Sequence, residues 1–107
     1  MLSTLILLLF RIMITLTPTT RIHLLPMQSS SVLGNETVVL NYELGNYYEL
    51  NEVGGFIWSL LNEKQEITVG EIQEKLLEEF DVEPAVCQEE LVSFLENLAH
   101  EKLIATT

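Results

Sequence analysis

Residues 45–58, GNYYELNEVGGFIW, decide the fold, because the hydrophobic period changes within them from two residues to 3.6. Residues 47–50 alternate as a strand does, and they follow the β-branched run TVVLNY at 37–42 across a short turn that contains Gly45. Two such runs predict a β-hairpin. From Asn51, a suitable N-cap, one apolar stripe predicts a first amphipathic helix, with Val53, Phe56, Ile57, Leu60 and Leu61 on its inner face.

Two further helices are expected downstream. Thr68 and Glu71 have the spacing of a capping box, and the helix that they open has an inner stripe of Ile72, Leu76 and Phe80. Pro84 suits the first position of a third helix. The apolar stripe of that helix comprises Cys87, Leu91, Phe94, Leu95 and Leu98, and the following pair Leu103-Ile104 is expected to return to the core.

Upstream of the hairpin the signals are weaker. Residues 22–25 predict a short strand ended by Pro26, and the polar residues 28–31 predict a loop before a turn at Gly34-Asn35. Residues 1–12 are apolar, but they are too short to span a bilayer and lack the features of a signal peptide. They are either a hydrophobic N-terminal extension or an over-long start, with Met13 as the favoured initiator, and the domain is expected over residues 13–107.

The order of these elements, strands first and then three helices, predicts an α+β fold. A small N-terminal antiparallel β-sheet followed by three α-helices is the pattern of a winged helix-turn-helix domain with its wing at the N-terminus. A chain of 107 residues has room for one such domain and little else.

The charge balance argues against nucleic acid and membrane surfaces as partners. The chain has 16 acidic and 5 basic residues, and residues 84–99 of the third helix contain three glutamates and no Lys or Arg. Carboxylates repel phosphate backbones, so DNA recognition by this helix is disfavoured. The single Cys87 fits a reducing cytoplasm and is interpreted as a buried apolar residue rather than a nucleophile. No catalytic motif or His/Cys cluster is present, so we expect no enzyme activity, no metal and no cofactor.

One flank of the third helix is small and apolar, formed by Ala85, Val92 and Ala99. It is either the margin of a wide core stripe or the wall of a shallow groove. Residues 47–50 offer a second wall: one pair of alternate side chains faces the core, and if that pair is Tyr48 and Leu50, Tyr47 is exposed on a strand with a free edge. A free edge beside an apolar groove favours a ligand that adds a strand to the sheet.

Residues 45–58 resemble the signature of PqqD-like proteins, which recognise ribosomally made precursor peptides. Residues 68–82 resemble the second helix of that family and its exit, and residues 94–104 resemble its closing segment, with Glu101-Lys102 where glycine is usual. The resemblance covers residues 38–104, and the upstream residues are more similar to stand-alone members from lasso-peptide clusters.

The resemblance implies a non-catalytic adaptor that binds the leader of a precursor peptide as an added strand. Its partner would be a transglutaminase-like leader peptidase, a cyclase or a radical enzyme. Alternatives are a chaperone for a radical-SAM enzyme, a winged-helix transcriptional regulator, and a subunit that uses its apolar flank to dimerise. The peptide-binding residues carried over from the family are Tyr47, Tyr48 and Leu50 on the strand, and Ala85, Val92 and Glu96 on the helix.

Overall fold

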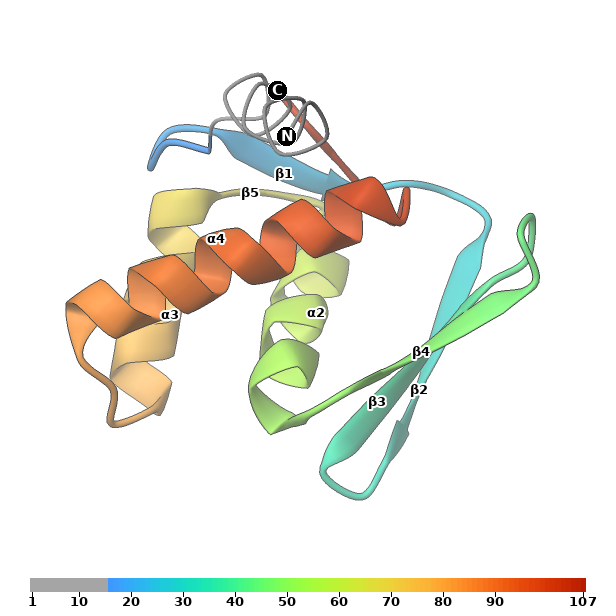
Figure 1. The fold of residues 1–107 in the computed structure, drawn as a ribbon, viewed down its shortest axis with the longest axis horizontal. Helices are drawn as coiled ribbons and strands as arrows, with labels where there is room; N and C mark the ends of the chain where they lie inside the picture. The colour runs from blue at the N-terminus through green and yellow to red at the C-terminus, as the bar shows by residue number, and fades with distance from the viewer. Residues whose placement is uncertain (1–15) are drawn as a thin grey trace, which may run out of the picture.

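The computed structural model describes residues 16–107, which form two three-stranded antiparallel sheets and three helices (Figure 1). Residues 1–12 lie outside this part of the chain, so neither interpretation of them is tested. The elements follow the predicted α+β order, with additional short strands. They are β1 (Arg21–Leu24), β2 (Gln28–Leu33), β3 (Glu36–Asn41), β4 (Asn46–Leu50), α2 (Glu52–Lys64), β5 (Glu66–Thr68), α3 (Val69–Glu79), α4 (Pro84–His100) and β6 (Ile104–Thr106).

The first sheet, here called the hairpin sheet, has the strand order β2-β3-β4. The predicted hairpin of β3 and β4 is confirmed, with Thr37 opposite Leu50 in the register. The prediction of a loop at residues 28–31 is wrong, because β2 pairs with β3 along its whole length. Its side chains are mostly exposed on both faces, so no hydrophobic alternation marks it as a strand. The tight turn at Gly34, where φ is +65°, is confirmed.

The second sheet has the order β5-β1-β6 and joins three distant segments of the chain. Its central strand contains Ile22, which is fully buried. The strands β5 and β6 have three residues each, too short to give a period of two in the sequence. Leu103 and Ile104 are buried here, which confirms that the end of the chain returns to the core.

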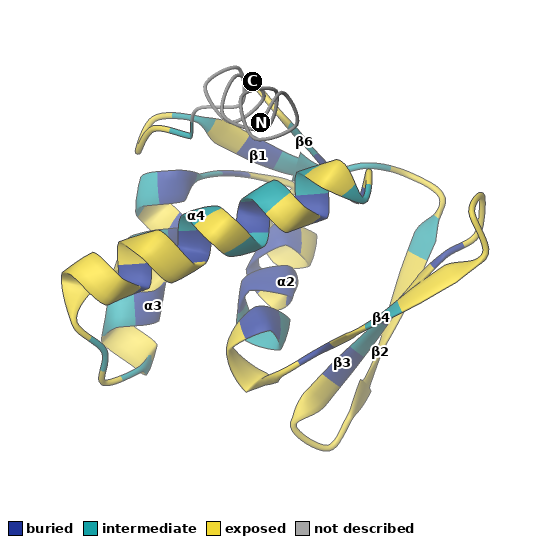
Figure 2. Ribbon diagram, viewed as in Figure 1, coloured by how far each residue is buried: buried dark blue, intermediate teal, exposed yellow. Residues whose placement is uncertain are grey.

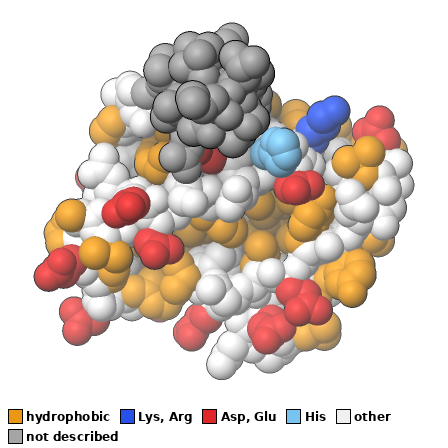
Figure 3. Space-filling view, viewed as in Figure 1, with side chains coloured by type: hydrophobic (Ala, Val, Ile, Leu, Met, Phe, Trp, Pro, Cys, Tyr) orange, Lys and Arg blue, Asp and Glu red, His pale blue; other side chains and the backbone are white. Residues whose placement is uncertain are grey.

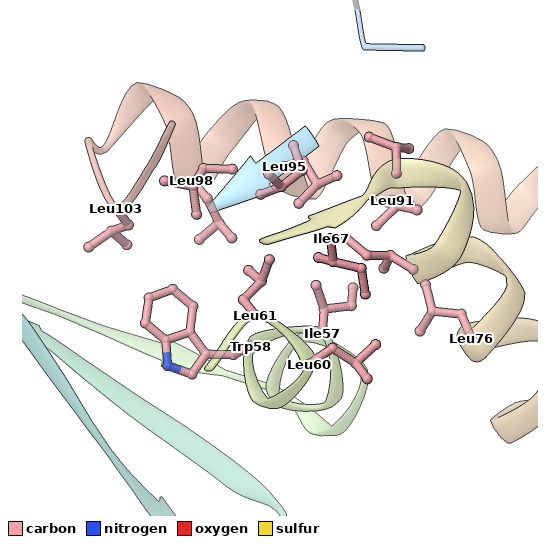
Figure 4. Close-up of a cluster of buried hydrophobic side chains, with 14 of the residues drawn as sticks. Ile57, Trp58, Leu60, Leu61, Ile67, Leu76, Leu91, Leu95, Leu98 and Leu103 are labelled. Carbon is pink, nitrogen blue, oxygen red and sulfur yellow. The ribbon is translucent and has the colours of Figure 1, made fainter. Parts of the chain in front are cut away.

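The hydrophobic core lies between the three helices and the two sheets (Figures 2 and 4). Figure 4 shows Leu91, Leu95 and Leu98 of α4 pointing toward α2. The largest buried side chain is that of Trp58, which the predicted stripe of the first helix omitted. Val53, which that stripe included, is 42% exposed. The difference arises because the first turn of α2 borders an open hollow rather than the core.

Side-chain caps fix the start of two helices. The Asn51 Oδ1 accepts a hydrogen bond of 2.9 Å from the Gly54 amide, and the Thr68 Oγ1 accepts one of 3.2 Å from the Glu71 amide. Both predicted N-caps are therefore confirmed. Pro84 opens α4 as expected. No helix within residues 16–107 combines the length and the apolar character needed to cross a membrane.

Candidate peptide-binding groove

A hollow of about 360 Å³ opens where α2 begins, α3 ends and α4 begins. Figure 3 shows hydrophobic side chains recessed between α4 and the hairpin sheet. Only Asn51 and Glu90 bring polar side chains to the lining. The other lining residues are Val53, Gly54, Ile57, Leu76, Phe80, Val82, Val86, Cys87, Leu91 and Phe94. A cavity of this composition suits an apolar side chain, with one carboxylate to meet a neighbouring positive charge.

The strand β4 ends at Leu50, directly before the lining residue Asn51, so it leads up to this hollow. Its outer edge is free among the described residues because β4 ends the order β2-β3-β4. Tyr47 is 66% exposed, Tyr48 is half-buried and Leu50 is buried, so the pair that points inward is Tyr48 and Leu50. The alternation means that one face of β4 packs inward and the other contacts solvent. The backbone groups along the edge are available to pair with another strand.

A hydrogen bond spans from β4 to the end of α4. The Tyr48 hydroxyl donates to the Glu101 Oε2 at 2.9 Å. Burial and this bond to the carboxylate raise the pKa of the Tyr48 hydroxyl, because both favour its neutral form. The contact ties the hairpin sheet to α4 at the end opposite the hollow, so β4 and α4 form two walls with α2 between them (Figure 1). We call the space between these walls the groove.

The α4 wall of the groove comes from a flank that the sequence reasoning did not select. Val86, Glu90 and Phe94 line the hollow, and Glu101 meets Tyr48 further along the same side. Their spacing of three and four residues could have identified this flank, since it repeats with the helical period. The sequence alone gave no reason to prefer it over the opposite flank, which has smaller residues.

The helix residues that the sequence analysis proposed for peptide binding do not line the hollow. Ala85, Val92 and Glu96 come together in a separate shallow depression, which α4 alone lines among the described residues. At 100° per residue, their flank is roughly 140° around the helix from that of Val86 and Phe94. The structure therefore groups the three helix residues with one another, and the three strand residues on β4, but does not bring the two groups together. The participation of the helix residues in binding stays a prediction.

Residues 16–107 contain no group of three His, Cys, Asp or Glu side chains placed to hold a metal ion. Cys87 is buried in the wall of the hollow, and this burial raises the pKa of its thiol. A raised pKa keeps the thiol protonated at neutral pH, and a protonated thiol is a poor nucleophile. The groove therefore offers backbone edges and apolar contacts, which serve binding.

Known proteins share both the sequence pattern and the fold. The family model of coenzyme PQQ synthesis protein D (PqqD) matches residues 36–104. A solved structure of TbiB1 in complex with the TbiA(beta) leader peptide is 30% identical in sequence, with a TM-score of 0.71 over 77% of this chain and 93% of TbiB1. A lasso peptide synthetase B1 complexed with the leader peptide is 19% identical, with a TM-score of 0.68 over 78% of this chain and 96% of that one.

No curated protein sequence matches the chain significantly. The match to the family model nevertheless spans more than half of the chain, and it includes the hairpin of β3 and β4 together with all three helices. This protein belongs to the PqqD family.

Proposed function

We propose that this protein binds the leader region of a ribosomally synthesised precursor peptide and presents it to the enzymes that modify it. The observation that carries the proposal is the free edge of β4 beside an apolar hollow, in a chain 30% identical to a protein solved with a leader peptide. The leader adds to β4 as a further strand of the hairpin sheet, which is β-augmentation.

The two walls have different tasks in this proposal. Hydrogen bonds from the edge of β4 hold the leader backbone whatever its sequence, because every residue except proline has the same donor and acceptor. The hollow selects side chains, since an apolar group gains free energy there and a polar group does not. Glu90 at its rim favours a basic residue near that anchor. Tyr47, Tyr48 and Leu50 belong to the strand wall, and Val86, Glu90 and Phe94 to the helix wall.

Ala85, Val92 and Glu96 remain candidates for a second contact with a long leader, or for a contact with the partner enzyme. Their depression faces away from the hollow. A variant at Val92 that leaves leader binding intact but weakens the interaction with the enzyme would assign the flank to the enzyme.

We further propose that the protein is not an enzyme and takes no cofactor. The chemistry would belong to a partner, either a leader peptidase of the transglutaminase type with a cyclase, or a radical enzyme. A single cysteine, buried and free, fits a cytoplasmic location.

The arrangement of α3, α4 and the hairpin sheet supports describing the fold as a winged helix-turn-helix in which the wing is β2-β3-β4. In a DNA-binding domain of that type α4 would enter the major groove. Its outer surface has Glu89 and Glu96 exposed or half-buried and no basic side chain except His100. We therefore propose that this protein uses the winged fold for peptides and not for DNA.

The proposal is tested with a fluorescein-labelled TbiA(beta) leader peptide, whose anisotropy is followed as the protein is added. Saturable binding is expected, and a scrambled peptide of the same composition is the control. In a second series, single backbone amides of the peptide are methylated one at a time. Methylation should weaken binding at alternate positions, because only every second amide of an added strand faces β4. Absence of saturable binding, or equal tolerance of methylation at all positions, would refute the proposal.

A further inference from the structure

Two adjacent glycines in the first turn of α2 lie close to α4, which is one wall of the groove, and to β3, the strand that pairs with the other wall. A Cβ atom on Gly54 would lie 3.2 Å from the Phe94 Cε1 on α4. A Cβ atom on Gly55 would lie 2.6 Å from the Thr37 Oγ1 on β3. Adjacent residues of a helix point about 100° apart, so Gly54 faces α4 and Gly55 faces the hairpin sheet. Both α4 and the hairpin sheet therefore approach α2 at a point where a side chain is absent.

A change in the contact between Gly55 and β3 also affects β4, the strand that forms the free edge. Thr37 is buried and lies directly opposite Leu50 of β4 in the register of the hairpin sheet. A displacement of β3 at Thr37 thus moves β4 with it, because the ladder of backbone hydrogen bonds couples the two strands. Thr37 itself is on neither wall, since β4 separates β3 from the groove.

We propose that Gly55 is a positioning residue that sets the distance between the edge of β4 and α4, and so the size of leader side chain that the groove accepts. The inference rests on the proposed function and adds to it a residue that acts without touching the peptide. Gly54 has the matching role for the α4 wall, through Phe94. A methyl group on Gly55 would widen the groove rather than fill it, whereas Gly54 lines the hollow, so a methyl group there would also take up space inside it.

A Gly55→Ala variant is expected to fold. Alanine favours the helix more than glycine does, and beyond the chain neighbours and the backbone of α2 the only atoms within 4 Å of the new methyl group belong to the Thr37 side chain. At 2.6 Å the overlap cannot be absorbed in place, and the buried branched side chain of Thr37 has little freedom to turn away. We therefore expect the hairpin sheet to shift away from α2.

The test compares the wild type with Gly55→Ala, Thr37→Ala and the double variant, each titrated with the labelled TbiA(beta) leader peptide. Gly55→Ala should bind about tenfold more weakly, the effect of losing part of one apolar contact across the groove. Thr37→Ala alone should bind as the wild type does. The double variant should regain affinity, because removal of the Thr37 hydroxyl leaves room for the methyl group.

An alanine scan of the peptide supplies a readout that loss of stability alone would not change. Against the wild type, one or two apolar positions should dominate the scan. Against Gly55→Ala, trimming the same positions should matter less, since the α4 wall no longer reaches them. Ile67→Val, in the β5-β1-β6 sheet, is the matched control: it removes one buried methyl group far from β4 and should leave the scan unchanged.

Two results would overturn the inference alone: wild-type affinity in a folded Gly55→Ala variant, or a folded double variant that stays tenfold weaker. If Gly55→Ala does not fold, the double variant tests the inference instead. The inference then requires that the double variant binds the peptide with the affinity of the wild type. A wild type that does not bind the peptide at all overturns the proposed function, and the inference with it.

Discussion

Replacing Val86 by glutamate tests which flank of α4 faces the leader, and the chain supplies a matched control in Val92. Both residues are valines on the same helix, but Val86 lines the hollow and Val92 lies in the depression on the other flank. Val86 is also in the first turn of α4, where a carboxylate interacts favourably with the positive end of the helix dipole. The substitution should therefore leave the fold intact.

The size of the effect follows from the exposure of Val86. Burying a whole valine side chain is worth about 2 kcal/mol, and 44% of Val86 remains exposed for a leader to cover, so about 1 kcal/mol of contact is lost. Placing a carboxylate at a half-open apolar rim, close to Glu90, costs about 1 kcal/mol more. The sum of about 2 kcal/mol corresponds to roughly a thirtyfold loss of affinity.

Titration calorimetry with the TbiA(beta) leader peptide measures both variants, and circular dichroism checks that each is folded. Val86→Glu should lose roughly thirtyfold in affinity, as estimated above from contact and charge. Val92→Glu should change leader affinity less than threefold, or about 0.5 kcal/mol, because Val92 is half-buried on the flank of α4 that does not line the hollow. The opposite ranking, with Val92→Glu weak and Val86→Glu unchanged, would show that the leader lies against Ala85, Val92 and Glu96 and that the α4 wall is assigned to the wrong flank.

Three further outcomes are expected. Lys102 has φ of +61°, so Lys102→Gly should stabilise the protein by about 1 kcal/mol in urea unfolding, whereas Lys102→Ala, which keeps a Cβ atom, should not. The raised pKa of Tyr48 means that the folded protein holds this proton where the unfolded chain has lost it, so unfolding should become easier as pH rises above 10. Tyr48→Phe should make that decline shallower in pH-dependent denaturation. Leu91→Glu places a charge in the core, at a residue that is fully buried, and should abolish the helical circular dichroism signal.

The elements that the sequence identified well are those in which one face is buried. In β3, β4 and the three helices, the same face of each element is buried along its length, so apolar residues recur with the period of that element. The caps at Asn51 and Thr68 depend only on side chains and backbone amides that are close in the sequence. The strand β2 was not predicted because its side chains are exposed on both faces, so apolar and polar residues do not alternate along it. It is a strand because its backbone pairs with β3. The short β5 and β6 depend on contacts with β1 that no local window contains.

Of the two walls of the groove, the strand wall could be predicted from the sequence and the helix wall could not. The alternation of Tyr47, Tyr48 and Leu50 follows from the sequence, because a strand has only two faces. A helix has a continuous surface, and its periodicity locates the buried stripe without showing on which side of that stripe the sheet lies. In this protein the side is determined by contacts between distant segments, Gly54 with Phe94 and Tyr48 with Glu101. Those contacts select the flank of Val86 over the flank of Val92.

The acidic charge of the protein affects how strongly a leader is attracted, whereas the apolar hollow determines which leader side chains are accepted. With 16 acidic and 5 basic residues, the chain attracts positively charged peptides over distances comparable to the screening length, about 8 Å at physiological ionic strength. The hollow has a single carboxylate among apolar side chains, so charge contributes little to the discrimination between anchors inside it. Added salt should therefore slow the association of a basic leader and leave the ranking of its apolar positions unchanged, because contacts between uncharged groups are not screened. An adaptor built in this way can recruit many basic leaders and still hold only those whose anchor fits between β4 and α4.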